Sequence, residues 1–252
     1  MRFGGEDGGV TVEIDEGVAD VRLDRPAKLN ALTPSLMAGI GEALAWLEGL
    51  DDLRCVVLSG EGRSFSAGMD LSVLTGGGIG ELSPRTHGIA NHAQHCTVGW
   101  RDLPVPVIAA IRGHCFGGGL QIALGADIRI ATPDARLSVM EMKHGLVPDM
   151  GLFVLLRGVM RADVLRELVY TARELNGEQA AELGLVTRVA DDPFTEAMVL
   201  AREIADRSPP AIRAAKRLFA RFDDGDAAAL LQAESDEQQV LVDAIWNAIK
   251  TG

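Results

Sequence analysis

The chain has 252 residues, of which 47% are hydrophobic and 24% charged, and its formal net charge is -12. This is the composition of a globular protein, and the length suits one large domain or a main domain with a smaller appendage. The negative charge argues against nucleic acid or an acidic membrane as a general partner. The three cysteines have no CxxC spacing, which disfavours a metal cluster and favours a reducing, cytoplasmic location.

The N-terminal third is predicted to contain a β-hairpin followed by a helix. The first residues are acidic and glycine-rich without a long apolar run, so neither a secretory signal nor a membrane span is expected. Residues 10–26 alternate apolar and polar side chains on both sides of a Glu-Gly pair, which predicts the hairpin. Residues 33–50 start with a Thr33 cap and Pro34, and their apolar residues recur at helical spacing.

The rest of the chain alternates strands with helices and then becomes helical. Buried strands are predicted at 54–60 and 105–113, and shorter strands at 127–132, 135–139 and 184–189. Helices follow at 194–208, 209–222 and 226–250, the last two separated by Asp-Asp-Gly-Asp. The pattern predicts an α/β fold, with a core at 1–192 and a C-terminal helical region at 193–252. The apolar face of the middle helix suits packing either on the core or on another subunit.

Two strands lead into glycine-rich helix starts, in residues 56–68 and 107–119. The first turn of a helix has backbone N–H groups without partners, and small residues there allow a ligand oxygen to approach them. The phosphate-loop pattern GxxxxGK[ST] is absent, and the spacing does not fit a dinucleotide fingerprint. Two interpretations remain, an oxyanion hole with one N–H from each loop or close packing of helix on strand.

Four segments together resemble the crotonase superfamily, also called the enoyl-CoA hydratase/isomerase family. They are "RPAKLNAL" (25–32), "GRSFSAGMDL" (62–71), "GHCFGGGLQIALGADIRIAT" (113–132) and "NGEQAAELGLVTRV" (176–189). The resemblance runs from about residue 10 to the end of the chain. It implies a spiral of repeated ββα units, C-terminal helices that build homotrimers or hexamers, and an acyl-CoA thioester as substrate. CoA would be part of the substrate, so neither a separate cofactor nor a metal is expected.

The resemblance also assigns roles to the glycine-rich loops. The N–H groups of Met69 and Gly118 would hold the thioester oxygen, and Ala67 and Gly68 would bind substrate beside them. A side chain at position 118 is expected to occupy the place of that oxygen.

The carboxylates are expected to decide the reaction. Family hydratases hold a water between two glutamates, and these positions match Gln121 and Glu141 here. An amide has no usable proton equilibrium. Asp149, eight residues after Glu141, is similar to the dienoyl-CoA isomerase branch and predicts double-bond migration by Glu141 and Asp149. The alternatives are hydration through Glu141 alone, with Gln121 binding substrate or water, and a non-catalytic acyl-CoA-binding scaffold. Asp149 also suits a turn cap, and Gln121 a structural contact.

Other residues have less specific predictions. Lys28 and Arg25 would meet CoA phosphates or lie on a solvated surface. Lys216 lies on the helix that, in relatives, reaches the CoA of a neighbouring subunit. Asp70 is predicted to cap a helix start, and residues 72–104 to shape the acyl pocket.

Overall fold

The computed structural model describes residues 1–5, 8–76, 81–222 and 227–251, so the Asp-Asp-Gly-Asp separator lies outside the described residues. Its main feature is a seven-stranded sheet in the order β1-β2-β3-β4-β5-β7-β9. The first three strands are antiparallel and the remaining pairs are parallel. The strands are β1 (Arg2–Gly5), β2 (Gly8–Asp15), β3 (Val18–Asp24), β4 (Cys55–Gly60), β5 (Val107–Ile111), β7 (Ile128–Ala131) and β9 (Arg188–Val189).

The strand predictions hold except near residue 184. The hairpin turns at Glu16 and Gly17, both with positive φ, and Asp15 pairs with Val18. The strand expected at 184–189 is reduced to the two residues of β9. Its first half instead closes the preceding helix, because the N–H groups of Leu185 and Val186 both donate to the carbonyl of Ala180.

A second set of parallel backbone pairings lies outside the large sheet. Strands β6 (His114–Phe116) and β8 (Arg136–Ser138) form a parallel pair, and isolated parallel bridges join Leu32 to Met69 and Ser66 to Cys115. Strands β3, β4 and β5 are each followed by a short segment that pairs with the next turn of the chain. This arrangement is the spiral of ββα units expected from the sequence, and the fold class is confirmed.

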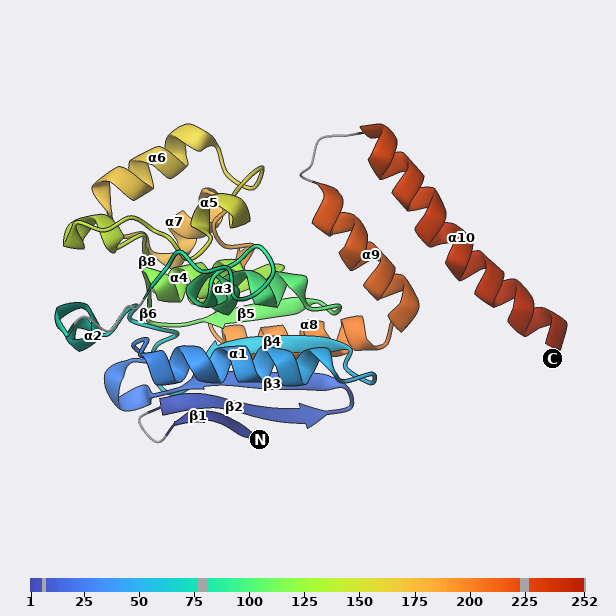
Figure 1. Cartoon of the computed structure of the whole chain (residues 1–252), viewed down its shortest axis with the longest axis horizontal. Coiled ribbons are helices and arrows are strands. Elements are labelled where there is room, and N and C mark those ends of the chain that lie inside the picture. Colours follow the sequence, from blue (N-terminus) through green and yellow to red (C-terminus); the bar gives the residue numbers. More distant parts are fainter. Residues whose placement is uncertain (6–7, 77–80, 223–226, 252) are drawn as a thin grey trace.

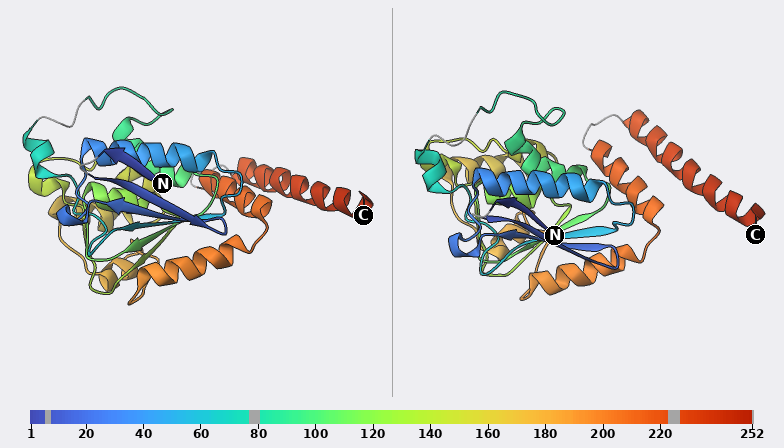
Figure 2. Two further views of the ribbon diagram at one scale, coloured as in Figure 1. Left: turned by 90° about the horizontal axis from the view of Figure 1, so that it is seen from below. Right: turned by 60° about the horizontal axis from the view of Figure 1, so that its bottom comes forward.

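Helices cover both faces of the sheet. Helix α1 (Pro34–Glu48) lies over one face and α8 (Pro193–Ala205) over the other (Figure 2). The side chain of Thr33 accepts the N–H of Leu36 at 3.2 Å, so the predicted cap of α1 is confirmed. The remaining short helices are η1 (Pro26–Lys28), α2 (Leu71–Thr75), α3 (His92–Asp102), α4 (Gly118–Leu124), η2 (Glu141–His144), α5 (Leu152–Leu155), α6 (Ala162–Thr171) and α7 (Gly177–Glu182).

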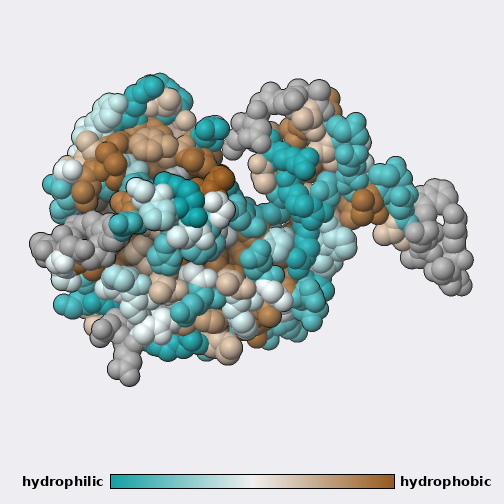
Figure 3. Space-filling view, viewed as in Figure 1, coloured by the Kyte–Doolittle hydropathy of each residue, from teal (hydrophilic) through white to brown (hydrophobic). Residues whose placement is uncertain are grey.

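The last two helices project from this body. Figure 1 shows α9 (Pro209–Phe222) and α10 (Ala227–Thr251) standing away from the sheet, whereas α8 packs on it. Phe219 and Phe222 on α9 are 71% and 65% exposed, and Figure 3 shows apolar patches on the projecting helices. The prediction that this apolar face packs on the core is therefore wrong for Phe219 and Phe222, which are exposed to solvent in the single chain.

The three cysteines lie in the core. Cys55, Cys96 and Cys115 are free and buried, and burial raises the pKa of the first two thiols to about 12. Buried thiols of this kind are unreactive. Within the described ranges, no helix combines the length and the hydropathy that crossing a bilayer requires.

Candidate active site

The segment that follows β4 lies beside β6, the strand that leads into the triple glycine. Ser66 pairs with Cys115, and the N–H of Phe116 donates to the carbonyl of Ser66 at 3.0 Å. Gly68 has a φ of +87°, and a Cβ added there would lie 2.8 Å from the carbonyl oxygen of Phe116. Only glycine allows this backbone conformation and this close approach. The two glycine-rich loops are thus held against each other.

Two backbone N–H groups of these loops have no partner among the described residues. The backbone bridge to Leu32 uses the residues on either side of Met69. The N–H of Leu32 donates to the carbonyl of Gly68 at 2.8 Å, and the N–H of Asp70 donates to the carbonyl of Leu32 at 2.9 Å. Gly118 is the first residue of α4, where helical N–H groups have no intrahelical acceptor. Neither Met69 nor Gly118 donates its N–H to any residue that the structure describes. Both groups are available to an oxygen atom of a ligand.

The triple glycine has a packing reason as well. A Cβ at Gly118 would lie 2.8 Å from Cδ1 of Leu32 and 2.9 Å from the sulfur of Met150, and one at Gly119 would lie 2.6 Å from the Ser66 side chain. The side-chain ends of Leu32 and Met150 would have to shift to admit a Cβ at 118, whereas a Cβ at 119 would also approach the backbone oxygen of Ser66 at 3.0 Å. The packing of α4 therefore favours glycine at both positions, and the expectation that a side chain at 118 would occupy the place of a substrate oxygen stays a prediction.

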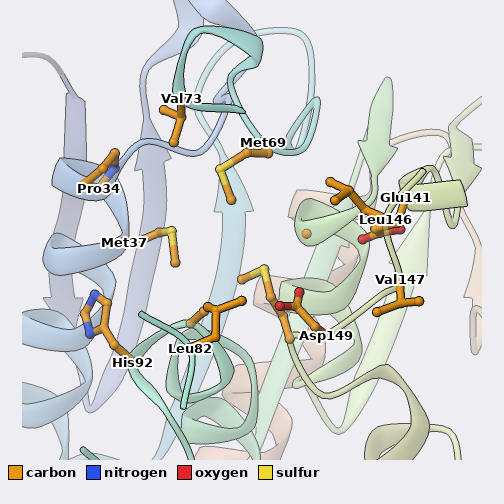
Figure 4. A pocket seen from close by; sticks show the side chains of 13 residues that line it. Pro34, Met37, Met69, Val73, Leu82, His92, Glu141, Leu146, Val147 and Asp149 are labelled. Atoms are coloured by element: carbon orange, nitrogen blue, oxygen red, sulfur yellow. The ribbon is translucent and has the colours of Figure 1, made fainter. Parts of the chain in front are cut away.

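Two cavities meet at this point. One has a volume of about 310 Å³ and the other about 450 Å³, and both are lined by Met69, Gly118, Glu141 and Leu146. The smaller cavity is otherwise mainly apolar, with walls that include Pro34, Met37, Val73, Leu82, Ala93 and Val147 (Figure 4). The larger cavity is lined by Lys28, Ala67, Gly68, Phe116 and His144, among others. The free N–H groups therefore lie at the junction of an apolar and a more polar compartment.

Glu141, which lines both cavities, has one carboxyl oxygen without a partner among the described residues. Its Oε1 accepts a hydrogen bond from Nε2 of Gln121 at 2.7 Å. Its Oε2 is buried and has no hydrogen-bond partner among the described residues. Burial raises the pKa of Glu141, and the charge of Asp149 raises it further. A buried carboxyl with a raised pKa on a cavity wall is a candidate for proton transfer.

Asp149 faces the smaller cavity from the loop between η2 and α5. Figure 4 shows its carboxyl and that of Glu141 on the side of the cavity opposite Met37 and His92. Burial raises the pKa of Asp149. Its carboxyl makes no hydrogen bond to another described residue, so the turn-capping alternative is not observed. The fold brings Glu141, Asp149 and the two N–H groups to one cavity.

Gln121 contacts Glu141 within the protein interior. Its side chain is buried, its Nε2 donates to Glu141, and its Oε1 accepts the N–H groups of Met150 at 3.0 Å and Leu152 at 3.2 Å. It lines neither cavity. The expected contact with substrate is therefore replaced by contacts within the protein.

The sequence profile of the enoyl-CoA hydratase/isomerase family matches residues 13–246. The chain belongs to this family. The resemblance to the crotonase superfamily inferred from the motifs is thereby confirmed.

Named relatives in the family differ in the activity that they carry. The chain is 32% identical over 210 residues to the mitochondrial Δ(3,5)-Δ(2,4)-dienoyl-CoA isomerase of Rattus norvegicus, a match that covers 79% of this chain but only 64% of the rat protein. It is also 32% identical to carnitinyl-CoA dehydratase of Salmonella enteritidis PT4, over 80% of this chain and 76% of that protein. The relatives thus include an isomerase and a dehydratase.

Solved structures of family members have the same fold. A putative enoyl-CoA hydratase from Streptomyces coelicolor A3(2) is 32% identical with a TM-score of 0.86, covering 98% of this chain and 92% of that one. A putative enoyl-CoA hydratase from Thermobifida fusca YX in complex with CoA is 32% identical with a TM-score of 0.83, covering 95% of both chains.

The residues expected at CoA phosphates occupy different environments. Lys28 is exposed and lines the larger cavity. Arg25 lines neither cavity and forms an ion pair with Asp70, with 2.7 Å between Nη1 and Oδ2. Asp70 caps α2, as predicted, and hydrogen bonds from Ser72 and Arg25 lower its pKa to about 2. Arg25 thus braces the loop that carries Met69 rather than facing the larger cavity.

Lys216 lies on α9 and lines neither of these cavities. Its ammonium group donates to Oδ2 of Asp127 at 2.6 Å and to the carbonyl of Val105 at 3.1 Å, and only 9% of the side chain is exposed. These contacts attach α9 to the body of the same chain. A role for Lys216 toward the CoA of another subunit stays a prediction.

Replacing Lys216 with alanine is expected to lower the free energy of unfolding by about 2 kcal/mol, between the cost of breaking a fully buried ion pair and that of an exposed one. Urea unfolding would measure the change. Arg217→Ala on the same helix is the matched control, because it breaks a more exposed pair with Glu237, and about 0.5 kcal/mol is expected there. Equal losses in the two variants would contradict a docking role for Lys216.

Several pocket residues were not singled out from the sequence. Met37 from α1, and Leu146, Val147 and Met150 from the loop before α5, line the smaller cavity. The only signal for them in the sequence was the apolar pair Leu146 and Val147 before Pro148, which lie in a loop and are 40% and 65% exposed.

In the described ranges, no group of three His, Cys, Asp or Glu side chains could hold a metal ion.

The segment 72–104 was expected to shape the acyl pocket. Val73, Leu82, His92 and Ala93 from this segment line the smaller cavity. Residues 77–80 of the segment lie outside the described residues.

Proposed function

We propose that this enzyme binds an acyl-CoA thioester and moves a carbon–carbon double bond along the acyl chain. One observation carries the proposal. Met69 and Gly118, whose N–H groups donate to no residue that the structure describes, line one cavity together with Glu141 and Asp149. The thioester oxygen would accept from both N–H groups, the acyl chain would fill the apolar cavity, and CoA would extend through the larger cavity past Lys28.

The reaction would need only proton transfers. An ionised carboxylate removes a proton from an acyl carbon, and the resulting negative charge spreads to the thioester oxygen, where two N–H groups stabilise it. A protonated carboxyl then returns a proton at a more distant carbon, so the double bond moves and no atom is gained or lost. Burial raises the pKa of both Glu141 and Asp149, and the charge of Asp149 raises that of Glu141 further, so one carboxyl would serve as the base and the other as the acid.

The cavity favours a compact, apolar acyl group. Its volume of about 310 Å³ is at the lower end of the range for small-molecule pockets, and methionine, leucine and valine side chains dominate its wall. A short to medium hydrocarbon chain suits both the size and the lining.

The exposed apolar side chains of α9 and α10 support the expected homotrimer or hexamer. They include Phe219, Phe222, Leu231 and Val240. Large apolar side chains on projecting helices are typical of surfaces that another subunit covers. The oligomeric state would be measured by light scattering.

Hydration through Glu141 alone is the alternative reaction. The dehydratase names of the Salmonella relatives favour it. Against it, the amide oxygen of Gln121 is already occupied by two backbone N–H groups, and Gln121 does not reach the cavity wall. Among the described residues that line the smaller cavity, Glu141 and Asp149 are the ionisable partners that a water would meet on this side.

A panel of three substrates tests the proposal. We expect the protein to isomerise 3-enoyl-CoA or 3,5-dienoyl-CoA, followed by ultraviolet absorbance, and to hydrate 2-enoyl-CoA much more slowly. Asp149→Asn should lower isomerisation about 100-fold, the size of one acid–base contribution. Fast hydration that survives Asp149→Asn and disappears in Glu141→Gln would establish the alternative. Tight CoA binding without turnover would indicate a binding scaffold.

A further inference from the structure

Gln121 joins three parts of the site through one side chain. It is 1% exposed, and its amide makes hydrogen bonds to Glu141 in η2 and to the backbone of Met150 and Leu152 at the start of α5. All three bonds are between 2.7 and 3.2 Å long. Because the Gln121 side chain is buried and lines neither cavity, any effect that it has on the reaction must pass through the residues to which it is hydrogen-bonded.

The bonds determine how the amide is oriented. An amide has one acceptor end and one donor end, and two backbone N–H groups can be met only by the oxygen. The NH₂ group of Gln121 must therefore face Oε1 of Glu141, which can only accept there. A proton on Glu141 is consequently confined to Oε2, the oxygen that has no hydrogen-bond partner among the described residues.

The same amide supports the turn that carries Asp149. The two N–H groups that it accepts flank Gly151, whose φ of +113° makes the sharp bend into α5. Asp149 precedes this bend directly. A change at position 121 would thus displace both carboxyls of the proposed proton-transfer pair.

We propose that Gln121 is a positioning residue that selects the reacting oxygen of Glu141 and holds that carboxylate in register with the Asp149 turn. The inference rests on the proposed function for the assignment of Glu141 as the proton-transfer group. It assigns Gln121 no contact with substrate.

Thr97 offers a matched control. Its hydroxyl on α3 donates to the carbonyl of Met150, so it supports the same turn, but it does not touch Glu141. Thr97→Val should therefore loosen the turn without changing the protonation of Glu141. Gln121→Met should do both, because it removes all three bonds with little change in side-chain length.

The pH dependence of kcat/KM on its acidic side distinguishes the effect of Gln121 on the Glu141 carboxyl from its support of the Asp149 turn. The amide stabilises ionised Glu141, so its loss raises the pKa of Glu141. The base form is then lost at a higher pH, and the acid limb of kcat/KM moves upward. The other charged groups acting on Glu141 are Asp149, which raises its pKa, and His144, which lowers it. Neither of these two residues is substituted in the variants.

We expect Gln121→Met to lower kcat about 10–100-fold, as loss of residues that orient metal ligands does, with a smaller change in KM and the limb shifted to higher pH. Thr97→Val should leave the limb where it is in the native protein. Gln121→Glu keeps an acceptor for both backbone N–H groups and should shift the limb further, because two carboxyls would then be in contact. Equal limbs in all four proteins would overturn the proposal.

A titration of the Glu141 carboxyl by ¹³C NMR in the ligand-free proteins makes the test independent of turnover. A higher pKa in Gln121→Met and Gln121→Glu, but not in Thr97→Val, supports the positioning role even if the proposed isomerisation fails in the substrate panel. An unchanged pKa in either Gln121 variant overturns it, whatever the substrate panel shows.

Discussion

Glu141→Gln is expected to lower the turnover number for double-bond migration by about 10³–10⁴-fold, the upper part of the range for a positioned acid–base group. The substitution keeps the size and the polarity of the side chain but removes the proton that the reaction must move. Oε2 is unpaired and buried, so no other described group donates to it or accepts from it. The turnover number would be measured from the change in ultraviolet absorbance at saturating substrate.

The binding of CoA should change little in the same variant, because the carboxyl acts on the acyl carbons rather than on the CoA moiety. Glu178→Gln, on the exposed first turn of α7, is the control for loss of a glutamate elsewhere. We expect that control to retain native turnover. A Glu141→Gln protein with turnover within tenfold of the native value would remove Glu141 from the mechanism.

Met69→Pro is expected to lower turnover by about 10²–10³-fold, the effect of removing one oxyanion-hole donor. Proline lacks an N–H, and at this position the native N–H donates to no described residue. The bridge between Leu32 and the loop uses the carbonyl of Gly68 and the N–H of Asp70 instead. The fold should therefore persist, as thermal unfolding would show.

Met69→Ala separates the side chain from the backbone. It keeps the N–H and removes the thioether that lines both cavities, so we expect a smaller loss, mainly in KM. Equal losses of turnover in the proline and alanine variants would mean that the side chain and not the N–H matters. Isomerisation at the native rate by Met69→Pro would exclude the proposed oxyanion hole.

The sequence alone indicated those features that neighbouring residues determine. The alternation around Glu16 and Gly17, the Thr33 cap and the Asp70 cap each depend on contacts within a few residues, and each was observed as expected. The family motifs extended this to the spiral fold, because their order and spacing follow its turns. They also identified the segments that carry Met69 and Gly118, and the resemblance matched Glu141 and Asp149 by position.

Only the tertiary structure decided what these residues touch. Gln121 and Glu141 are 20 residues apart in the chain, and Lys216 and Asp127 are 89 apart. Side-chain type alone left Gln121 open between substrate and structure, and Lys216 open toward a neighbouring subunit. A hydrogen bond depends on distance and direction, and packing of one turn of the spiral against the next sets both. Where an amide, a carboxyl or an ammonium group finds its partner is thus a property of the packed spiral and not of the local sequence.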